Sequence, residues 1–316
     1  MAAAARLAAR ALPMSRPNPA VGALLVRDGR VVARGYTLPG GRPHAEAALF
    51  DGLGEGAAKG ATLYATLEPC AHRSNRGPAC ADLVIAAAPT RVVIGQRDPD
   101  PRTSGIGADR IARAGIEVEF LDDAASERSL CGYMMQKLRG RPRVTLKLAT
   151  SLDGCIALPD GSSQWITGAV ARAHVHAHRA RADGIVVGGE TWRADRPGLD
   201  VRLPGLIRRS PDRYVLTRGA PPDGVKTISE PTQISQMDGV QYLYLEGGAG
   251  AAASFMAHDL VDELHLYRAP IVIGAGRRAL GDIGIAKLDD AHGRWKCVDR
   301  RQLGSDEFTA YRRIRA

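Results

Sequence analysis

The chain has 316 residues, more than one ordinary hydrophobic core requires and comfortable for two domains. Apolar residues make up 45% and charged residues 24%, which excludes a disordered chain, and no apolar run approaches the roughly 18 to 20 residues that span a bilayer. The formal charge of +9 suits either nucleic acid or small anions, but the scattered basic residues favour local phosphate pockets. We therefore expect a cytoplasmic protein of two domains, without membrane contact.

The first half of the chain alternates β-rich and helical segments after an alanine-rich first helix over residues 1–12. A hairpin is predicted around Asp28-Gly29. The predicted strands are residues 20–26, 30–34, 61–67, 91–95 and 116–120, and the predicted helices are residues 44–53, 78–87, 108–114 and 124–138. Strands separated by helices indicate a largely parallel sheet with helices on both faces. This half is predicted to be an α/β domain.

A domain junction is predicted at residues 139–143, where Gly140 and Pro142 interrupt a charged segment. The predicted domains are therefore residues 1–140 and 141–316. The second half continues with strands 144–150, 184–188, 213–217, 241–245 and 263–269, helices 169–182 and 249–257, and a closing hairpin over 295–314. It is also α/β, with a different order of elements.

Two of the five cysteines are close enough in sequence to form a metal site. The odd cysteine count and the absence of a secretion signal disfavour disulfides. One histidine and two cysteines, His44, Cys70 and Cys80, give catalytic zinc three ligands and one open position. The His-x-Glu pattern followed by Pro-Cys is typical of zinc deaminases, in which the glutamate is the general acid/base. We predict zinc at these three ligands and catalysis by Glu46.

Two other interpretations of the His44, Cys70 and Cys80 pattern remain. In a zinc-stabilised assembly module the metal would recruit a fourth protein ligand, for which His72 is the only nearby candidate, and such a site would not require Glu46. The second alternative is a deaminase of nucleic-acid bases with an appended binding domain. The long loop between Cys70 and Cys80 and the aromatic content of 5% argue against it, because bases of single strands usually stack on aromatic side chains.

Motifs in both halves resemble the bifunctional riboflavin-biosynthesis deaminase/reductase family, over nearly the whole chain. In the first half they are Asn18-Pro19 with Val21-Gly22, Pro43-His44-Ala45-Glu46, Leu67-Glu68-Pro69-Cys70, Gly77-Pro78-Ala79-Cys80-Ala81-Asp82 and Arg97-Asp98-Pro99-Asp100-Pro101. In the second half they are residues 147–154 and 163–167, Gly189-Glu190-Thr191, Ala194-Asp195, Pro197-Gly198-Leu199 and Glu246-Gly247-Gly248. The resemblance implies a cytidine-deaminase-like three-layer α/β/α domain followed by a dihydrofolate-reductase-like α/β domain.

The resemblance also implies two reactions on a small phosphorylated pyrimidine, and no nucleic-acid partner. The first is zinc-dependent hydrolytic deamination of 2,5-diamino-6-ribosylamino-4-pyrimidinone 5′-phosphate. The second is reduction of the ribosyl group to ribityl by NADPH. Members of the family form homo-oligomers, so a dimer or larger assembly is expected.

Site residues follow from the resemblance position by position. Those expected to contact the deaminase substrate are Asn18, His72 and Arg76. Those expected to bind NADPH are Thr150, Trp165, Thr191, Asp195, Gly247 and Gly248, and those expected at the sugar phosphate are Ser163, Arg179, Leu199, Arg202 and Glu246. Simpler interpretations stay open: a solvated basic loop before Cys80, a core position for Trp165 and a solvated helix face for Arg179.

The chain departs from the family pattern in three places. The loop between Cys70 and Cys80 is one residue longer than usual, and Thr37 stands where many relatives have a histidine. The segment between Arg202 and Gln241 is short, which predicts trimmed peripheral strands. Three histidines at every second residue from 174 to 178 cannot share one helical face, so we do not predict a metal site there.

Overall fold

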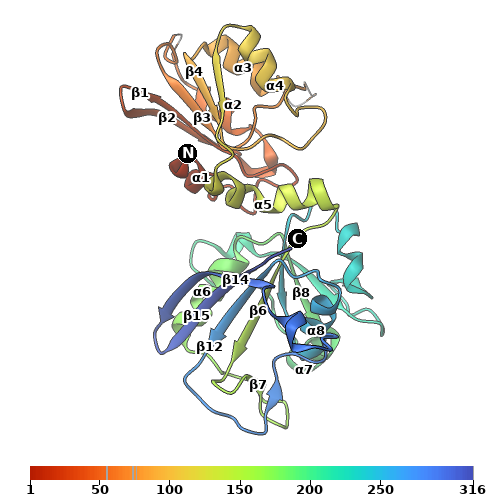
Figure 1. The fold of residues 1–316 in the computed structure, drawn as a ribbon. Coiled ribbons are helices and arrows are strands. Elements are labelled where there is room, and N and C mark those ends of the chain that lie inside the picture. The colour runs from red at the N-terminus through yellow and green to blue at the C-terminus, as the bar shows by residue number, and fades with distance from the viewer. Residues whose placement is uncertain (55, 73–74, 76, 316) are drawn as a thin grey trace. The chain divides into compact units, whose positions relative to one another are not determined.

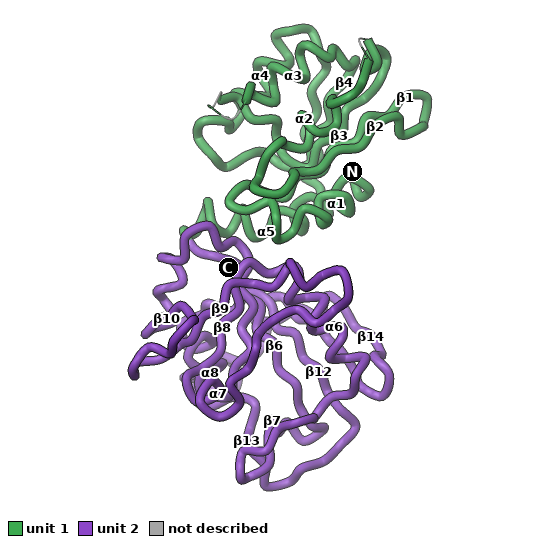
Figure 2. The backbone as a smooth tube through the Cα atoms, turned by 180° about the vertical axis from the view of Figure 1, so that it is seen from behind, with its two compact units in different colours: residues 1–140 green, residues 141–316 purple. Residues whose placement is uncertain are grey.

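The computed structural model (Figure 1) describes every residue except 55, 73–74, 76 and 316. The chain divides into two compact units, residues 1–140 and residues 141–316 (Figure 2). Within the described residues, no helix is both long and apolar enough to cross a membrane. Each unit is a β-sheet with helices packed against it, and each is described by itself below.

Unit 1 contains a five-stranded sheet. Its strands are β1 (Gly22–Arg27), β2 (Arg30–Tyr36), β3 (Thr62–Ala65), β4 (Arg91–Ile94) and β5 (Glu117–Phe120), and its helices are α1 (Ala2–Ala8), α2 (Ala45–Phe50), α3 (Cys80–Ala87), α4 (Ile106–Arg113) and α5 (Ala124–Arg139). The strand order is β2-β1-β3-β4-β5, in which only the β3-β4 and β4-β5 pairs are parallel. The sheet is therefore mixed and not largely parallel as predicted, because β1 pairs antiparallel with both β2 and β3.

Two glycines allow helices to approach opposite faces of this sheet. A Cβ on Gly22 would lie 2.1 Å from the carbonyl oxygen of Ala4 in α1, and a Cβ on Gly35 would lie 2.1 Å from that of Ala45 at the start of α2. Gly35 pairs with Ala23, the neighbour of Gly22, so the two glycines face opposite sides. Helices α1 and α5 cover one face and α2, α3 and α4 the other, which gives three layers (Figure 1).

Helix α5 ends at the predicted junction. It begins with the side chain of Asp123, which accepts hydrogen bonds from the backbone amides of Ala125 and Ser126 at 3.0 and 3.2 Å. It ends at Gly140, whose φ of 66° lies in the left-handed region that commonly closes a helix. These local signals fix both ends of the last element of unit 1.

Unit 2 contains an eight-stranded sheet and a short two-stranded one. The strands are β6 (Arg143–Thr150), β7 (Cys155–Ala157), β8 (Gly184–Gly188), β9 (Asp212–Leu216), β10 (Lys226–Ile228), β11 (Tyr242–Glu246), β12 (Glu263–Arg268), β13 (Arg277–Arg278), β14 (Trp295–Leu303) and β15 (Asp306–Arg313). The helices are α6 (Ala169–Arg179), α7 (Gly189–Asp195) and α8 (Ala249–Ala257). The sequence did not predict β7, β10, β13 or α7, which are too short to show a periodic pattern.

The larger sheet of unit 2 has the order β10-β9-β8-β11-β6-β12-β15-β14. The strands from β10 to β12 are parallel, and β15 and β14 continue the sheet antiparallel. Separate apolar cores fill the two faces, one containing Phe255 of α8 and the other Val175 of α6. Because parallel strands end on the same side, the carboxyl ends of β6, β8, β9 and β11 form one common edge.

Candidate functional site

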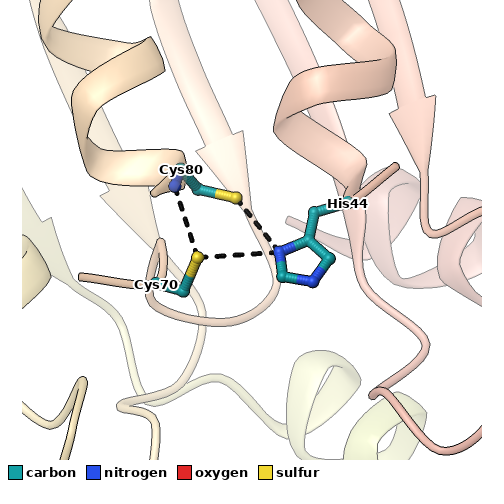
Figure 3. Close-up of side chains that lie close together, drawn as sticks. All are labelled: His44, Cys70 and Cys80. Carbon is teal, nitrogen blue, oxygen red and sulfur yellow. Dashed lines mark hydrogen bonds between the residues drawn. The ribbon is translucent and has the colours of Figure 1, made fainter. Parts of the chain in front are cut away.

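Three candidate metal ligands come together in unit 1 (Figure 3). His44 precedes α2, Cys70 follows β3 and Cys80 begins α3. Nδ1 of His44 lies 3.3 Å from Sγ of Cys80 and 3.6 Å from Sγ of Cys70, and the three ligand atoms lie within 4.8 Å of one another. Elsewhere in the described part of the chain, no comparable group occurs. One imidazole and two thiolates are a donor set that catalytic zinc takes, so these residues fit the metal.

The pKa values of the two cysteine thiols are shifted in opposite directions. The backbone amide of Cys80 donates a hydrogen bond to Sγ of Cys70 at 3.3 Å. Hydrogen bonding from Cys80 lowers the pKa of Cys70 to about 4, whereas the contact with Cys70 and then burial raise the pKa of Cys80. Cys70 is therefore a thiolate at neutral pH, the form in which cysteine binds a metal.

Glu46 lies in the first turn of α2, beside these ligands, and is only 3% exposed. Burial raises the pKa of Glu46, and the neighbouring His44 opposes that rise. A carboxyl group whose pKa moves towards neutrality exchanges protons more readily at physiological pH. The position and the environment of Glu46 suit a general acid/base next to a metal.

Asn18 contacts the histidine of the metal cluster. Its side-chain nitrogen lies 3.1 Å from Nε2 of His44 and donates a hydrogen bond to the carbonyl of Gly41 at 2.8 Å. The imidazole therefore has Nδ1 towards the two sulfurs and Nε2 towards Asn18. A partner on the second ring nitrogen fixes the orientation of a metal-binding histidine.

Thr37, the residue that departs from the family pattern, holds the turn that carries Asn18. Its buried hydroxyl donates to the carbonyl of Pro19 at 2.9 Å and accepts from the amide of Val21 at 3.0 Å. Both bonds fix the backbone directly after Asn18. Thr37 therefore has a structural role beside the metal cluster.

Glu68 is a buried carboxylate whose role the sequence did not reveal. It is 2% exposed and accepts hydrogen bonds from the amides of Ala108 and Gly105, each at 3.1 Å, and of Asp98 at 3.4 Å. These hydrogen bonds connect the segment before Cys70 with the start of α4. In the sequence, the signal that could have indicated this role is an acidic residue between a predicted strand and a metal ligand.

The loop between Cys70 and Cys80 is described only in part. Nδ1 of His72 lies 3.5 Å from the hydroxyl oxygen of Thr103, which follows the motif at residues 97–101. Arg76, the predicted phosphate contact, lies outside the described residues, as does Arg73. The role of this loop at a phosphate stays a prediction.

In unit 2, two glycine turns face each other at the common edge of the strands. A Cβ on Gly248, after β11, would lie 3.3 Å from the hydroxyl oxygen of Thr191, and a Cβ on Gly188, at the end of β8, would lie 3.2 Å from Cβ of Ala251. Only glycine leaves this backbone open to a close-fitting ligand. The turns form a cradle of the kind that suits a dinucleotide phosphate, so these residues fit NADPH.

A buried ion pair lies at the same edge. Nε and Nη2 of Arg179 donate to the two carboxylate oxygens of Glu246 at 2.6 and 2.9 Å, and Nη1 donates to the carbonyl of Asp200 at 2.9 Å. Burial would raise the pKa of Glu246, but Arg179 outweighs that effect and the pKa is lowered. Arg179 is thus engaged by protein groups and does not lie on a solvated face. Lys147 of β6 pairs with Glu246 of β11 in the sheet. The sequence did not predict that these two residues are neighbours.

Trp165 lies on the surface of unit 2 and is 63% exposed, which excludes the core position that the sequence left open. The guanidinium of Arg172 stands 4.7 Å from the centre of its ring, while Ser163 nearby is half-buried. An exposed aromatic ring can stack on a planar group of a ligand. Its role at NADPH remains a prediction.

The other predicted residues of unit 2 occupy different environments. Thr150, at the end of β6, and Leu199 are buried, whereas Asp195, at the end of α7, is exposed. Arg202 pairs with Asp200 at 3.3 Å. Asp200 thus joins the segment of Arg202 to the Arg179–Glu246 pair through its backbone carbonyl.

Comparisons with known proteins define the class of this chain. Residues 1–96 match the family model of the cytidine and deoxycytidylate deaminase zinc-binding region, and residues 142–234 and 232–308 match that of the RibD C-terminal domain. With the metal cluster described above, these matches define a zinc-dependent deaminase joined to a second, RibD-type domain.

Relatives that align over almost the whole chain give the family. The riboflavin biosynthesis protein RibD of Escherichia coli K12 is 35% identical, with 97% of this chain and 96% of that protein aligned. The solved structure of Acinetobacter baumannii RibD, form 1, has 32% identity and a TM-score of 0.88, covering 99% of this chain and 97% of its own. This chain belongs to the RibD family, whose members are bifunctional deaminase/reductases of riboflavin biosynthesis.

A third relative connects the family with its two activities. The Thermotoga maritima protein, described as a diaminohydroxyphosphoribosylaminopyrimidine deaminase/5-amino-6-(5-phosphoribosylamino)uracil reductase, has 29% identity and a TM-score of 0.86 over 99% of this chain and 97% of its own. The comparisons confirm the family resemblance, the two α/β folds, the zinc-dependent deaminase and the NADPH-dependent reductase that the motifs implied. They do not favour the alternative of a nucleic-acid base deaminase.

Proposed function

We propose that unit 1 deaminates 2,5-diamino-6-ribosylamino-4-pyrimidinone 5′-phosphate and that unit 2 then reduces the ribosyl group of the product to ribityl. The observation that carries the proposal is the cluster of His44, Cys70 and Cys80 beside buried Glu46, in a chain that aligns end to end with RibD relatives. The substrates follow from the family resemblance and from the described activities of the Thermotoga maritima protein.

In unit 1, we assign the metal to His44, Cys70 and Cys80. When bound, zinc supplies Lewis-acid activation of water at neutral pH. Glu46 accepts a proton from the attacking water and passes it to the ring nitrogen. It then transfers the remaining hydroxyl proton to the amino group, which departs as ammonia. Its burial keeps this transfer away from bulk solvent.

The deaminase substrate is held by residues around this cluster. Asn18 contacts Nε2 of His44 and so lies next to the metal cluster, which supports its assignment as a substrate contact. We assign His72 and Arg76 to the remaining contacts, with Arg76 at the phosphate, because a guanidinium binds phosphate oxygens in pairs. The phosphate thereby fixes the position of the amino-bearing carbon.

In unit 2, the hydride would come from NADPH when it is bound. We assign the backbone of Gly247 and Gly248 and the hydroxyl of Thr191 to its phosphates, since these groups border the cradle. The further residues assigned to NADPH are Thr150, Trp165 and Asp195, and those assigned to the sugar phosphate are Ser163, Leu199, Arg202 and Glu246. Arg179 serves the same subsite by fixing Glu246 and the backbone of Asp200.

Product analysis tests this function. The purified protein is supplied with the diaminopyrimidine nucleotide, with and without NADPH, and the products are identified by mass. Without NADPH we expect replacement of one amino group by oxygen, and with NADPH the gain of two further hydrogens. An unchanged nucleotide in both samples contradicts the proposal, whereas deamination of a single-stranded oligonucleotide would support the alternative.

We also propose that the enzyme works in the cytoplasm as a homo-oligomer, as the sequence and the resemblance imply. Light scattering on the purified protein measures the mass of the assembly. A monomer at all concentrations contradicts the second part of this proposal.

A further inference from the structure

Helix α4 packs against the backbone segment that carries Cys70. A Cβ on Gly107 would lie 2.0 Å from the carbonyl oxygen of Pro69, so a larger residue could not occupy this position without moving the backbone. The amide of Ala108, the next residue, donates a hydrogen bond to the carboxylate of Glu68 at 3.1 Å. Helix α4 is therefore in direct contact with the two residues that precede this metal ligand.

Arg110, in the same helix, contacts both segments that carry a cysteine ligand. Its Nη1 donates a hydrogen bond to the carbonyl oxygen of Ala71 at 2.7 Å, and its Nη2 forms an ion pair with Asp82. Ala71 directly follows Cys70, and Asp82 lies in the first turn of α3, which begins with Cys80. A single guanidinium group thus connects the segment of one cysteine with the helix of the other.

The two cysteine segments are also joined by their backbone. The amide of Ala81 donates to the carbonyl of Cys70 at 3.1 Å, and the amide of Cys80 donates to Sγ of Cys70 at 3.3 Å. Arg110 adds a connection outside these bonds, on the residues that follow each cysteine. Because a guanidinium presents its donors in fixed directions, it limits the movement of its two partners relative to each other.

The surroundings of Arg110 allow this connection to matter. The side chains of Arg110 and Asp82 are 35% and 22% exposed, so water screens their ion pair only in part. The second contact joins a charged donor to a backbone carbonyl, and hydrogen bonds with a charged partner are among the stronger ones. Arg110 is therefore held on both sides and does not lie free on the surface of α4.

We propose that Arg110 is a positioning residue of the deaminase centre. By holding Ala71 and Asp82, it sets the spacing of the sulfurs of Cys70 and Cys80 and thereby the affinity of the metal cluster for zinc. Groups that support metal ligands without touching the metal commonly have this effect. The inference rests on the proposed zinc centre of unit 1.

Zinc binding by the full-length protein tests this role. Competition with a chromogenic chelator gives the zinc dissociation constants of the wild type, Arg110→Ala and Arg110→Lys. We expect about ten- to a hundredfold weaker binding in Arg110→Ala. Lysine is a single point charge that cannot hold both partners in fixed directions, so Arg110→Lys should restore only part of the affinity. The visible absorption of the cobalt-substituted proteins reports ligand geometry, and it should change in the same order.

Two control variants separate positioning from a general loss of stability. Arg113→Ala removes an exposed arginine from α4, the same helix, and should preserve zinc affinity and the cobalt spectrum. Arg91→Ala removes the ion pairs with Glu117 and Glu119 at the start of β4, so it matches the loss of an ion pair in Arg110→Ala. Zinc affinity should again stay at the wild-type value.

The outcomes distinguish this inference from the proposed zinc centre. Wild-type affinity and spectrum in Arg110→Ala overturn the inference, and so does an equal weakening in Arg91→Ala. If Cys80→Ser loses zinc while Arg110→Ala does not, the zinc centre stands and only the positioning role fails. If Cys80→Ser also keeps wild-type affinity, the zinc centre itself fails. Should Arg110→Ala not fold, Asp82→Asn removes the charge of the ion pair instead, and wild-type affinity in that variant overturns the inference.

Discussion

The metal cluster of unit 1 and the cofactor edge of unit 2 are built in different ways. In unit 1, three side chains from separate elements bring their ligand atoms within 4.8 Å of one another. In unit 2, the ends of parallel strands present glycine backbone, supported by the buried pair of Arg179 and Glu246. One substitution among the three side chains of the metal cluster should therefore abolish deamination. Cofactor binding at the glycine backbone of unit 2 should instead depend on the side chains that hold this backbone in place.

The largest expected effect is in the metal cluster. Cys80→Ser removes one of the three ligands that the described residues supply, so we expect loss of both zinc and ammonia release. NADPH oxidation with the deaminated nucleotide should continue, because the substitution lies in unit 1. Metal analysis and the two activity assays measure this; full ammonia release from a metal-free preparation would refute the assignment.

Glu46→Gln should separate metal binding from catalysis. Glutamine has nearly the same shape but cannot carry the proton, so zinc content should stay normal while deamination falls by about 10²- to 10⁴-fold. The matched control is Glu127→Gln, a change of the same kind at an exposed position of α5. Near-normal turnover in Glu46→Gln would assign a structural role to this carboxyl group.

In unit 2, the largest effect should be on stability. Arg179→Leu leaves Glu246 buried without its partner, and breaking a buried ion pair in this way costs about 3–5 kcal/mol of unfolding free energy. Urea unfolding measures the loss, with zinc content as a check on unit 1. The double change Arg179→Leu with Glu246→Leu should regain part of it. Equal stability of the single variant and the wild type would show that the pair contributes little.

A smaller effect is expected from half-buried histidines between α6 and the sheet. Burial lowers the pKa of His178 and of His174. The ring of His178 contacts that of His265, and Nδ1 of His174 lies 2.8 Å from the hydroxyl oxygen of Tyr267. The unfolded chain keeps histidine pKa values of about 6.5, so below that pH it binds more protons than the folded state. Stability is therefore full above about pH 6.5 and falls as the pH decreases below it.

Thermal unfolding across this pH range checks the expectation. His178→Phe should make the decline shallower, because it removes one group that the folded state keeps neutral. His258→Ala, an exposed position after α8, should leave it unchanged. A melting temperature of the wild type that does not fall on acidification would contradict this account of the histidines.

Features encoded by neighbouring residues were predictable from the sequence. The motifs placed His44 and Cys80 at helix starts and Cys70 after a strand, where the structure has them. The junction was marked by Gly140, whose left-handed conformation ends α5. These signals were readable because each depends on the local chain.

Features that depend on distant contacts were not predictable. The three amides that bind Glu68 come from residues 30 to 40 positions later in the chain. Glu246 and Arg179 are 67 positions apart, and neither shows its partner in the sequence. The antiparallel pairing of β1 with β3 likewise arises from the sheet as a whole and not from a local pattern.

We infer that this chain carries two separate chemical centres, one in each unit. The most direct test supplies Asp195→Ala with the diaminopyrimidine nucleotide and NADPH and follows ammonia, NADPH oxidation and product mass. We predict normal ammonia release, loss of NADPH oxidation and accumulation of the deaminated but unreduced ribosylamino nucleotide. Loss of both activities in a folded variant that retains zinc would contradict the claim.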